Sequence, residues 1–192
     1  MKLFNLIFLL IFNLLCFNNL TNATVVADLE IDGYSIGQKL TDKLSEKYIK
    51  NNIQPYFEDE RQYYIVYSDK NLETFKDLEI YLKTNDTNYT IKSINAGLYP
   101  DNLDDCLKKQ NQIVSDISKE LNIQFNKSSG KHSYYKNTIN RSYDAVIDGG
   151  YISVECLYFD KKDKKLYPNL ADNLAIHVMS NEIVKWFESG YK

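Results

Sequence analysis

Residues 143–159 read YDAVIDGGYISVECLYF, two runs rich in β-branched and aromatic side chains on either side of Asp148-Gly149-Gly150. Such side chains fit the pleated surface of a strand. Glycine tolerates the positive φ angles that the tightest hairpin turns require. The segment therefore predicts a β-hairpin with strands over 143–147 and 151–159.

More strands are predicted elsewhere in the chain. Residues 63–67 have the same aromatic and β-branched content. The alternating run over 78–83, the turn at Asn85-Asp86 and the run over 89–94 predict a second hairpin. Residues 174–179 predict one further strand near the C-terminus.

Helices are predicted in three places. Apolar residues recur at helical spacing over about 38–50, and more regularly over 103–121, after the helix start at Pro100-Asp101. Ser180 is placed to cap a short C-terminal helix. Blocks of strands and helices with hairpin-length links are typical of the α+β class. We therefore expect a mostly antiparallel sheet, with two main helices and the C-terminal helix packed on one face.

The first 27 residues have the order of a secretory signal peptide: Lys2, an apolar run over 3–17, and a polar exit that ends at Val25-Val26-Ala27. The apolar run is shorter than the roughly 20 residues that span a bilayer, so a membrane anchor is the weaker alternative. Lipid attachment at Cys16 is a third interpretation, but the preceding Leu15 is not the small residue that it needs.

Cleavage is expected after Ala27, with Ala23 as the second choice. The mature chain over 28–192 is long enough for one domain with a sizeable core and is expected to have no membrane span. Its expected destination is the periplasm or the medium. The net charge of −3 argues against nucleic acid as a partner, because phosphate binding needs clustered excess Lys and Arg.

Three cysteines are present, and removal of the leader leaves Cys106 and Cys156. Disulfides persist outside the cytoplasm, so an even pair predicts a single bridge. Cys106 lies on the apolar stripe of the predicted helix over 103–121, and Cys156 lies in the late hairpin. The bridge would join helix to sheet; two buried free thiols are the alternative.

The sequence contains no catalytic signature, no phosphate loop and no dinucleotide motif, so no catalytic residue and no cofactor are predicted. No metal site is predicted, because His132 and His177 are far apart and neither has a His or Cys nearby. His177 alternates with Ile176 and Val178, and is expected to face solvent. Paired carboxylates for hydrolysis could come from several acidic residues, but nothing brings two of them to one cleft: Glu58, Asp59, Glu60, Asp144, Asp148 and Glu155.

Two basic segments, expected to be loops over 126–141 and 161–165, could form one patch for an anionic partner such as lipid headgroups or polysaccharide. Ordinary solvated loops are the alternative. The candidate patch comprises Lys127, Lys131, Lys136, Arg141, Lys161, Lys162, Lys164 and Lys165.

The segments 29–40 and 44–46 resemble a family of small exported proteins of AT-rich marine alphaproteobacteria. The similarity extends to the strand over 89–94, to Cys106 and Cys156, and to Asn173-Leu174. The resemblance implies a bacterial envelope location and the two-cysteine framework, but no activity or ligand.

These observations predict an exported, non-catalytic binding or interaction protein, with an envelope protein or a small ligand as its partner. The alternative is an exported hydrolase of polymeric substrate that uses carboxylates near the sheet.

Overall fold

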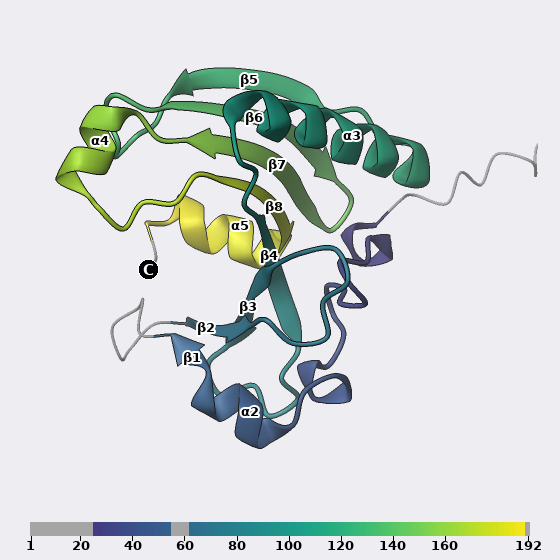
Figure 1. Ribbon diagram of the computed structural model, residues 1–192. Helices are drawn as coiled ribbons and strands as arrows, with labels where there is room; N and C mark the ends of the chain where they lie inside the picture. The colour runs from purple at the N-terminus through teal and green to yellow at the C-terminus, as the bar shows by residue number, and fades with distance from the viewer. Residues whose placement is uncertain (1–24, 55–61, 191–192) are drawn as a thin grey trace, which may run out of the picture.

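The computed structural model describes residues 25–54 and 62–190. Within these residues the strands form one antiparallel sheet in the order β1-β2-β3-β4-β8-β7-β6-β5 (Figure 1). The strands are β1 (Ile53–Gln54), β2 (Tyr63–Ser68), β3 (Asp77–Lys83), β4 (Ile91–Leu98), β5 (Asn126–Lys131), β6 (Ile139–Ile147), β7 (Gly150–Tyr158) and β8 (Asn173–Ser180). The predicted α+β class and antiparallel sheet are confirmed.

The chain order explains how the sheet is assembled. Strands β1 to β4 form one antiparallel meander and β5 to β7 form a second. The last strand, β8, then inserts between β4 and β7 and pairs with both. The two meanders become one sheet only through this insertion, so side chains from both halves of the chain meet around β8.

The predicted hairpin over 143–159 is confirmed as β6 and β7. Ile147 pairs with Gly150 at the turn, and Gly149 has the positive φ of 77° that the turn requires. Ile152, Val154 and Cys156 alternate along β7 and are fully buried in the main core.

Helix α3 (Leu103–Leu121) covers this core on one face of the sheet. The Asn102 side chain caps it by accepting a 2.9 Å hydrogen bond from the Asp105 amide, and the helix ends at Asn122, which has a φ of 51°. Buried Gln110 donates from Nε2 to two strand carbonyls, those of Arg141 at 2.8 Å and Val154 at 2.9 Å. These bonds fix the helix on β6 and β7.

The predicted Cys106–Cys156 disulfide is present in the structure. The two Sγ atoms lie 2.10 Å apart and the two Cα atoms 6.0 Å apart. Both cysteines are fully buried, so the bridge joins α3 to β7 inside the core.

The helix expected over about 38–50 is divided in two. A 3-10 turn, η2 (Leu40–Asp42), precedes α2 (Glu46–Asn51), and another 3-10 turn, η1 (Val26–Asp28), lies near the start of the described chain. Ser45 interrupts the first helix, because its Oγ accepts a 3.3 Å bond from the Tyr48 amide and starts α2 afresh.

Helix α5 (Asn181–Glu188) begins at the predicted cap, with Ser180 Oγ 3.5 Å from the Ile183 amide. It differs from the prediction in one respect: it lies on the face opposite α3 (Figure 1). Its buried side chains pack on a second apolar cluster, formed by Tyr63, Ile65 and Tyr81. This cluster needs a cover of its own, since an apolar sheet face must be buried against another element.

Ion pairs hold α5 against β3 and β4. Glu182 lies 2.6 Å from Lys83 Nζ and 3.0 Å from Lys92 Nζ. The hydrogen bond from Lys83 is the main reason that the pKa of Glu182 falls to about 2. The bond from Lys92 lowers the pKa further, whereas burial acts in the opposite direction.

No helix among the described residues is long and apolar enough to cross a bilayer.

The two segments expected to be basic loops are partly regular. Residues 126–131 form the edge strand β5, and Lys161–Leu166 forms helix α4, capped by Asp160. All of β5 is exposed, so it has no apolar alternation that would reveal a strand in the sequence. Polar, lysine-bearing edges are common because they discourage pairing with other chains.

Candidate functional site

A row of polar side chains crosses the middle of the sheet on the α5 face. Glu79 on β3 lies opposite Asn95 on β4, and Asn95 lies opposite His177 on β8. His177 in turn lies opposite Ser153 on β7. Helix α5 covers the apolar end of this face, while the polar row lies beyond its cluster.

His177 lies at the centre of a hydrogen-bonded line across the sheet. Its Nδ1 is 2.9 Å from Asn95 Oδ1, and the Asn95 Nδ2 donates to Glu79 Oε2 at 3.4 Å. Because the amide nitrogen of Asn95 faces a carboxylate, its oxygen faces the ring, and Nδ1 of His177 carries a hydrogen. The other ring nitrogen, Nε2, lies 3.6 Å from Glu155 Oε2.

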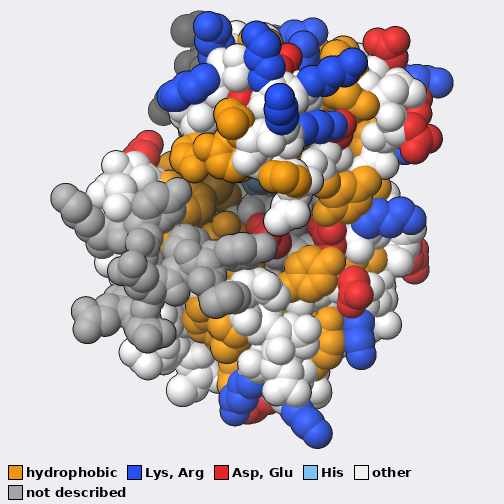
Figure 2. Space-filling model, turned by 60° about the vertical axis from the view of Figure 1, so that its left-hand side comes forward, with side chains coloured by type: hydrophobic (Ala, Val, Ile, Leu, Met, Phe, Trp, Pro, Cys, Tyr) orange, Lys and Arg blue, Asp and Glu red, His pale blue; other side chains and the backbone are white. Residues whose placement is uncertain are grey.

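The prediction that His177 faces solvent is therefore incomplete. Its side chain is only 25% exposed and forms part of the wall of a depression in the sheet. We call this depression the sheet hollow. It has a volume of about 310 Å³ and is lined by Asp77, Glu79, Asn95, Ala96, Gly97, Tyr99, His132, Glu155, Leu157, Asn173, Ala175 and His177. Figure 2 shows it with carboxylates and a histidine on its floor.

Carboxylates dominate the charge of the sheet hollow. Asp77, Glu79 and Glu155 line it, and none of its lining residues in the described chain is Lys or Arg. The Tyr99 hydroxyl donates to Asp77 Oδ2 at 2.5 Å; burial, together with this bond, raises the pKa of Tyr99. A Cβ at Gly97 would lie 2.4 Å from Asp77 Oδ1, so the glycine leaves room for this carboxylate.

Of the described carboxylates among those considered from the sequence, only Glu155 lines the sheet hollow. Residues 58–60 are outside the described residues. Asp144 accepts hydrogen bonds from Tyr151 at 2.5 Å, Ser142 at 2.7 Å and Ser153 at 2.8 Å. Burial alone would raise the pKa of Asp144, but these bonds lower it, so its role is to organise β6 and β7.

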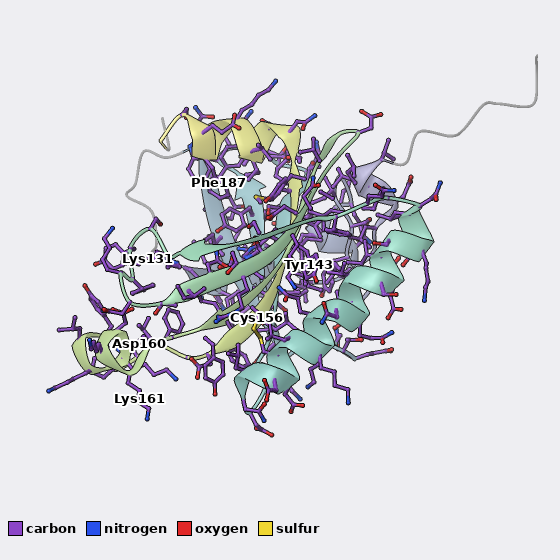
Figure 3. All side chains as sticks on the ribbon, turned by 90° about the horizontal axis from the view of Figure 1, so that it is seen from above. Lys131, Tyr143, Cys156, Asp160, Lys161 and Phe187 are labelled. Atoms are coloured by element: carbon purple, nitrogen blue, oxygen red, sulfur yellow. A yellow bond between two sulfur atoms is a disulfide. The ribbon has the colours of Figure 1, made fainter. Side chains whose placement is uncertain are left out.

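The structure brings the two predicted basic segments together at one end of the molecule (Figure 3). Asp163 of α4 is buried and accepts bonds from the Asn137 amide at 3.0 Å and Thr138 Oγ1 at 2.7 Å. Burial opposes ionisation of Asp163, but the bonds from Asn137 and Thr138 lower its pKa. The rings of Tyr134 and Tyr167 add a contact, with centroids 5.8 Å apart.

The eight predicted patch residues have different surroundings. Arg141, Lys161 and Lys162 line a groove beside α4. Lys164 pairs with Asp172, and Lys127 lies over the Tyr143 ring, 5.3 Å from its centroid. The remaining three, Lys131, Lys136 and Lys165, are exposed.

The sheet hollow can bind a positively charged group, because carboxylate oxygens are strong acceptors for cationic donors. His177 beside Glu155 can also give or take a proton. A metal ion would need three or more suitable ligands together, and the described residues contain no such group of His, Cys, Asp and Glu side chains.

Comparison with known proteins finds no matching family model, no matching curated protein and no matching solved structure. The function is therefore argued from the site alone.

Proposed function

We propose that this chain is an exported binding protein that holds a small organic cation in the sheet hollow. The carrying observation is the presence of three carboxylates, Asp77, Glu79 and Glu155, with no lining Lys or Arg in the described residues. Each hydrogen bond between a charged acceptor and a cationic donor contributes about 1.5–3 kcal/mol. An anion would meet repulsion from the same side chains.

Size and shape favour a small ligand. A volume of about 310 Å³ is at the lower end of the range for small-molecule sites. Ala175 and Leu157 supply apolar contact between the polar groups. These features suit an alkylamine or a guanidinium compound, whose apolar carbons would rest on the strands while its head contacts the carboxylates.

Glutamine in place of Glu155 is expected to weaken cation binding about tenfold, because one charge-assisted hydrogen bond becomes neutral. Isothermal titration with primary amines, guanidinium compounds and neutral alcohols of equal size measures this effect. The matched control is Glu120→Gln, which removes the same charge from an exposed position on α3. Equal binding of the alcohols, or an equal loss in Glu120→Gln, would contradict the proposal.

The second candidate is the predicted exported hydrolase of polymeric substrate. The placement of His177 beside Glu155, in an open depression of the sheet, favours it. Turnover of cell-wall glycan or peptide that is abolished in Glu155→Gln would select this function over simple binding.

Export is the other half of the proposal, and the packing of Val26 supports cleavage after Ala23 rather than Ala27. Val26 is 3% exposed, and its amide donates to the Asp148 carbonyl at 2.9 Å. A chain that began at Asp28 would lose both the burial and this bond, whereas one that began at Thr24 would keep them.

The mature exported protein is accordingly expected to begin at Thr24. Intact mass and N-terminal sequencing of protein from the medium or periplasm of a bacterial host expressing residues 1–192 measure the start. A start at Asp28 would contradict the proposed cleavage site, and retention of the unprocessed chain in the cytoplasm would contradict export.

A further inference from the structure

The groove beside α4 is distinct from the sheet hollow and has the opposite charge. It has a volume of about 500 Å³ and lies between the start of α3, strands β6 and β7, and α4. Arg141, Lys161 and Lys162 line it together with apolar Leu103 and Ile139. We call it the basic groove. Its combination of cations and hydrocarbon fits the headgroup and upper chain of an anionic lipid.

One acidic side chain, that of Asp160, also lines the basic groove, but its carboxylate already caps α4. Asp160 accepts a 2.8 Å hydrogen bond at Oδ1 from the Lys162 amide and caps α4. The segment 126–141 contains no Asp or Glu, and it adds Lys131, Lys136 and Arg141 to this end of the molecule. The overall net charge of −3 therefore conceals a basic end of the molecule.

Exposed apolar side chains lie on α4 and on the segments next to it. Leu166 is 69% exposed, Tyr134 is 62% exposed and Tyr167 is 40% exposed. Leu166 lies one helical turn after Lys162, so the two side chains share a face of α4. Figure 2 shows Lys and Arg side chains gathered with hydrophobic ones in the region above the sheet hollow.

This end of the molecule is held in place before any ligand arrives. Buried Asp163 ties α4 to the turn over 133–138 through Asn137 and Thr138. Tyr135 packs between Phe159 and Tyr167, with ring centroids 5.0 and 5.5 Å away. Because the backbone that carries the lysines is already ordered, binding to a charged surface costs little backbone entropy.

We propose that the basic groove and α4 dock this protein on an anionic lipid membrane. Lysines near such a surface attract it electrostatically, while Tyr and Leu side chains enter the interface between headgroups and chains. A soluble polyanion would use the lysines equally well, but it would give exposed Leu166 no apolar partner. The proposal is independent of what occupies the sheet hollow.

Vesicle sedimentation tests this with the processed exported protein. It is expected to bind vesicles of mixed phosphatidylglycerol and phosphatidylcholine, to bind phosphatidylcholine alone far more weakly, and to dissociate as salt is raised. The triple variant Lys161→Gln/Lys162→Gln/Lys165→Gln is expected to lose about fivefold in partitioning for each lysine, on the order of 100-fold together.

The matched control carries the same charge change on α3: Lys108→Gln/Lys109→Gln/Lys119→Gln, at three exposed positions. Near-normal vesicle binding by this control supports the proposal. An equal loss of binding would show that net charge alone explains the effect, and would overturn the proposal. Absence of binding to phosphatidylglycerol vesicles overturns it as well. If Leu166→Ser binds these vesicles as tightly as the natural protein, Leu166 does not enter the membrane interface and the proposed docking through α4 is overturned.

Discussion

Alanine at Cys156 is expected to lower the free energy of unfolding by about 2–5 kcal/mol. The bridge closes a loop with a sequence separation of 50, for which the chain-entropy argument gives about 4 kcal/mol. It also joins α3 to β7; after its loss, the Gln110 hydrogen bonds and the apolar packing of α3 still hold the helix on the sheet. The corresponding fall in melting temperature is on the order of 10 °C.

Chemical denaturation with and without a reducing agent measures this effect. Cys106→Ala, Cys156→Ala and the double variant should lose similar stability, because each removes the same covalent link. The natural protein in reducing agent should approach them, and the variants should not respond to the reductant. A natural protein whose stability is unchanged by reduction would show that the bridge does not constrain the unfolded chain.

Local patterns in the sequence predict the elements that local interactions determine. The hairpin over 143–159 depends on its own turn glycines, and α3 depends on a regular apolar stripe and a cap, so both could be predicted. The edge strand β5 could not, because a fully exposed strand needs no apolar alternation. The face covered by α5 depends on Tyr63, Ile65 and Tyr81, whose meeting with the helix is a matter of topology.

The sheet hollow was missed for a similar reason. Its central line joins Glu79, Asn95, His177 and Glu155. The first two already pair within the first meander, but they meet His177 and Glu155 only because β8 inserts between the two meanders. The sequence holds only a weak signal for these four residues: each is polar and lies at an alternate position of an otherwise apolar strand. Such positions ordinarily face solvent, and only the register shows that these four face one another.

The second large effect is expected at Gly150, where alanine should cost about 3 kcal/mol or more of unfolding free energy. A Cβ there would lie 2.1 Å from the Met179 carbonyl oxygen and 2.9 Å from Val26 Cγ2. The first of these atoms is backbone of the neighbouring strand, so the clash cannot be relieved by a side-chain rotation. β7 must therefore move away from β8, and Val26 must shift in the core as well.

Two other glycines, Gly149 in the β6–β7 turn and Gly130 in β5, supply a graded control. In Gly149→Ala the Cβ would be in ordinary contact with Val26 Cγ1 at 3.5 Å, but the residue must keep a φ of 77°, which costs about 1–2 kcal/mol when a side chain is present. Gly130→Ala, on the exposed strand β5, has nothing within 4 Å and should change stability by less than about 0.5 kcal/mol. Urea denaturation of the three variants should therefore rank Gly150 first, Gly149 second and Gly130 last.

The ranking also tests how the late hairpin is coupled to the start of the described chain. Val26 lies against Gly150, and its amide bonds to the Asp148 carbonyl in the same turn. Because β7, β8 and Val26 pack closely, Gly150→Ala should expose the amide of Val26 to hydrogen exchange as well as lower stability. Equal stability of the Gly150 and Gly130 variants would mean that β7 and β8 do not pair in this register. Because the same pairing positions His177 beside Glu155, the proposed arrangement of the sheet hollow would then be wrong as well.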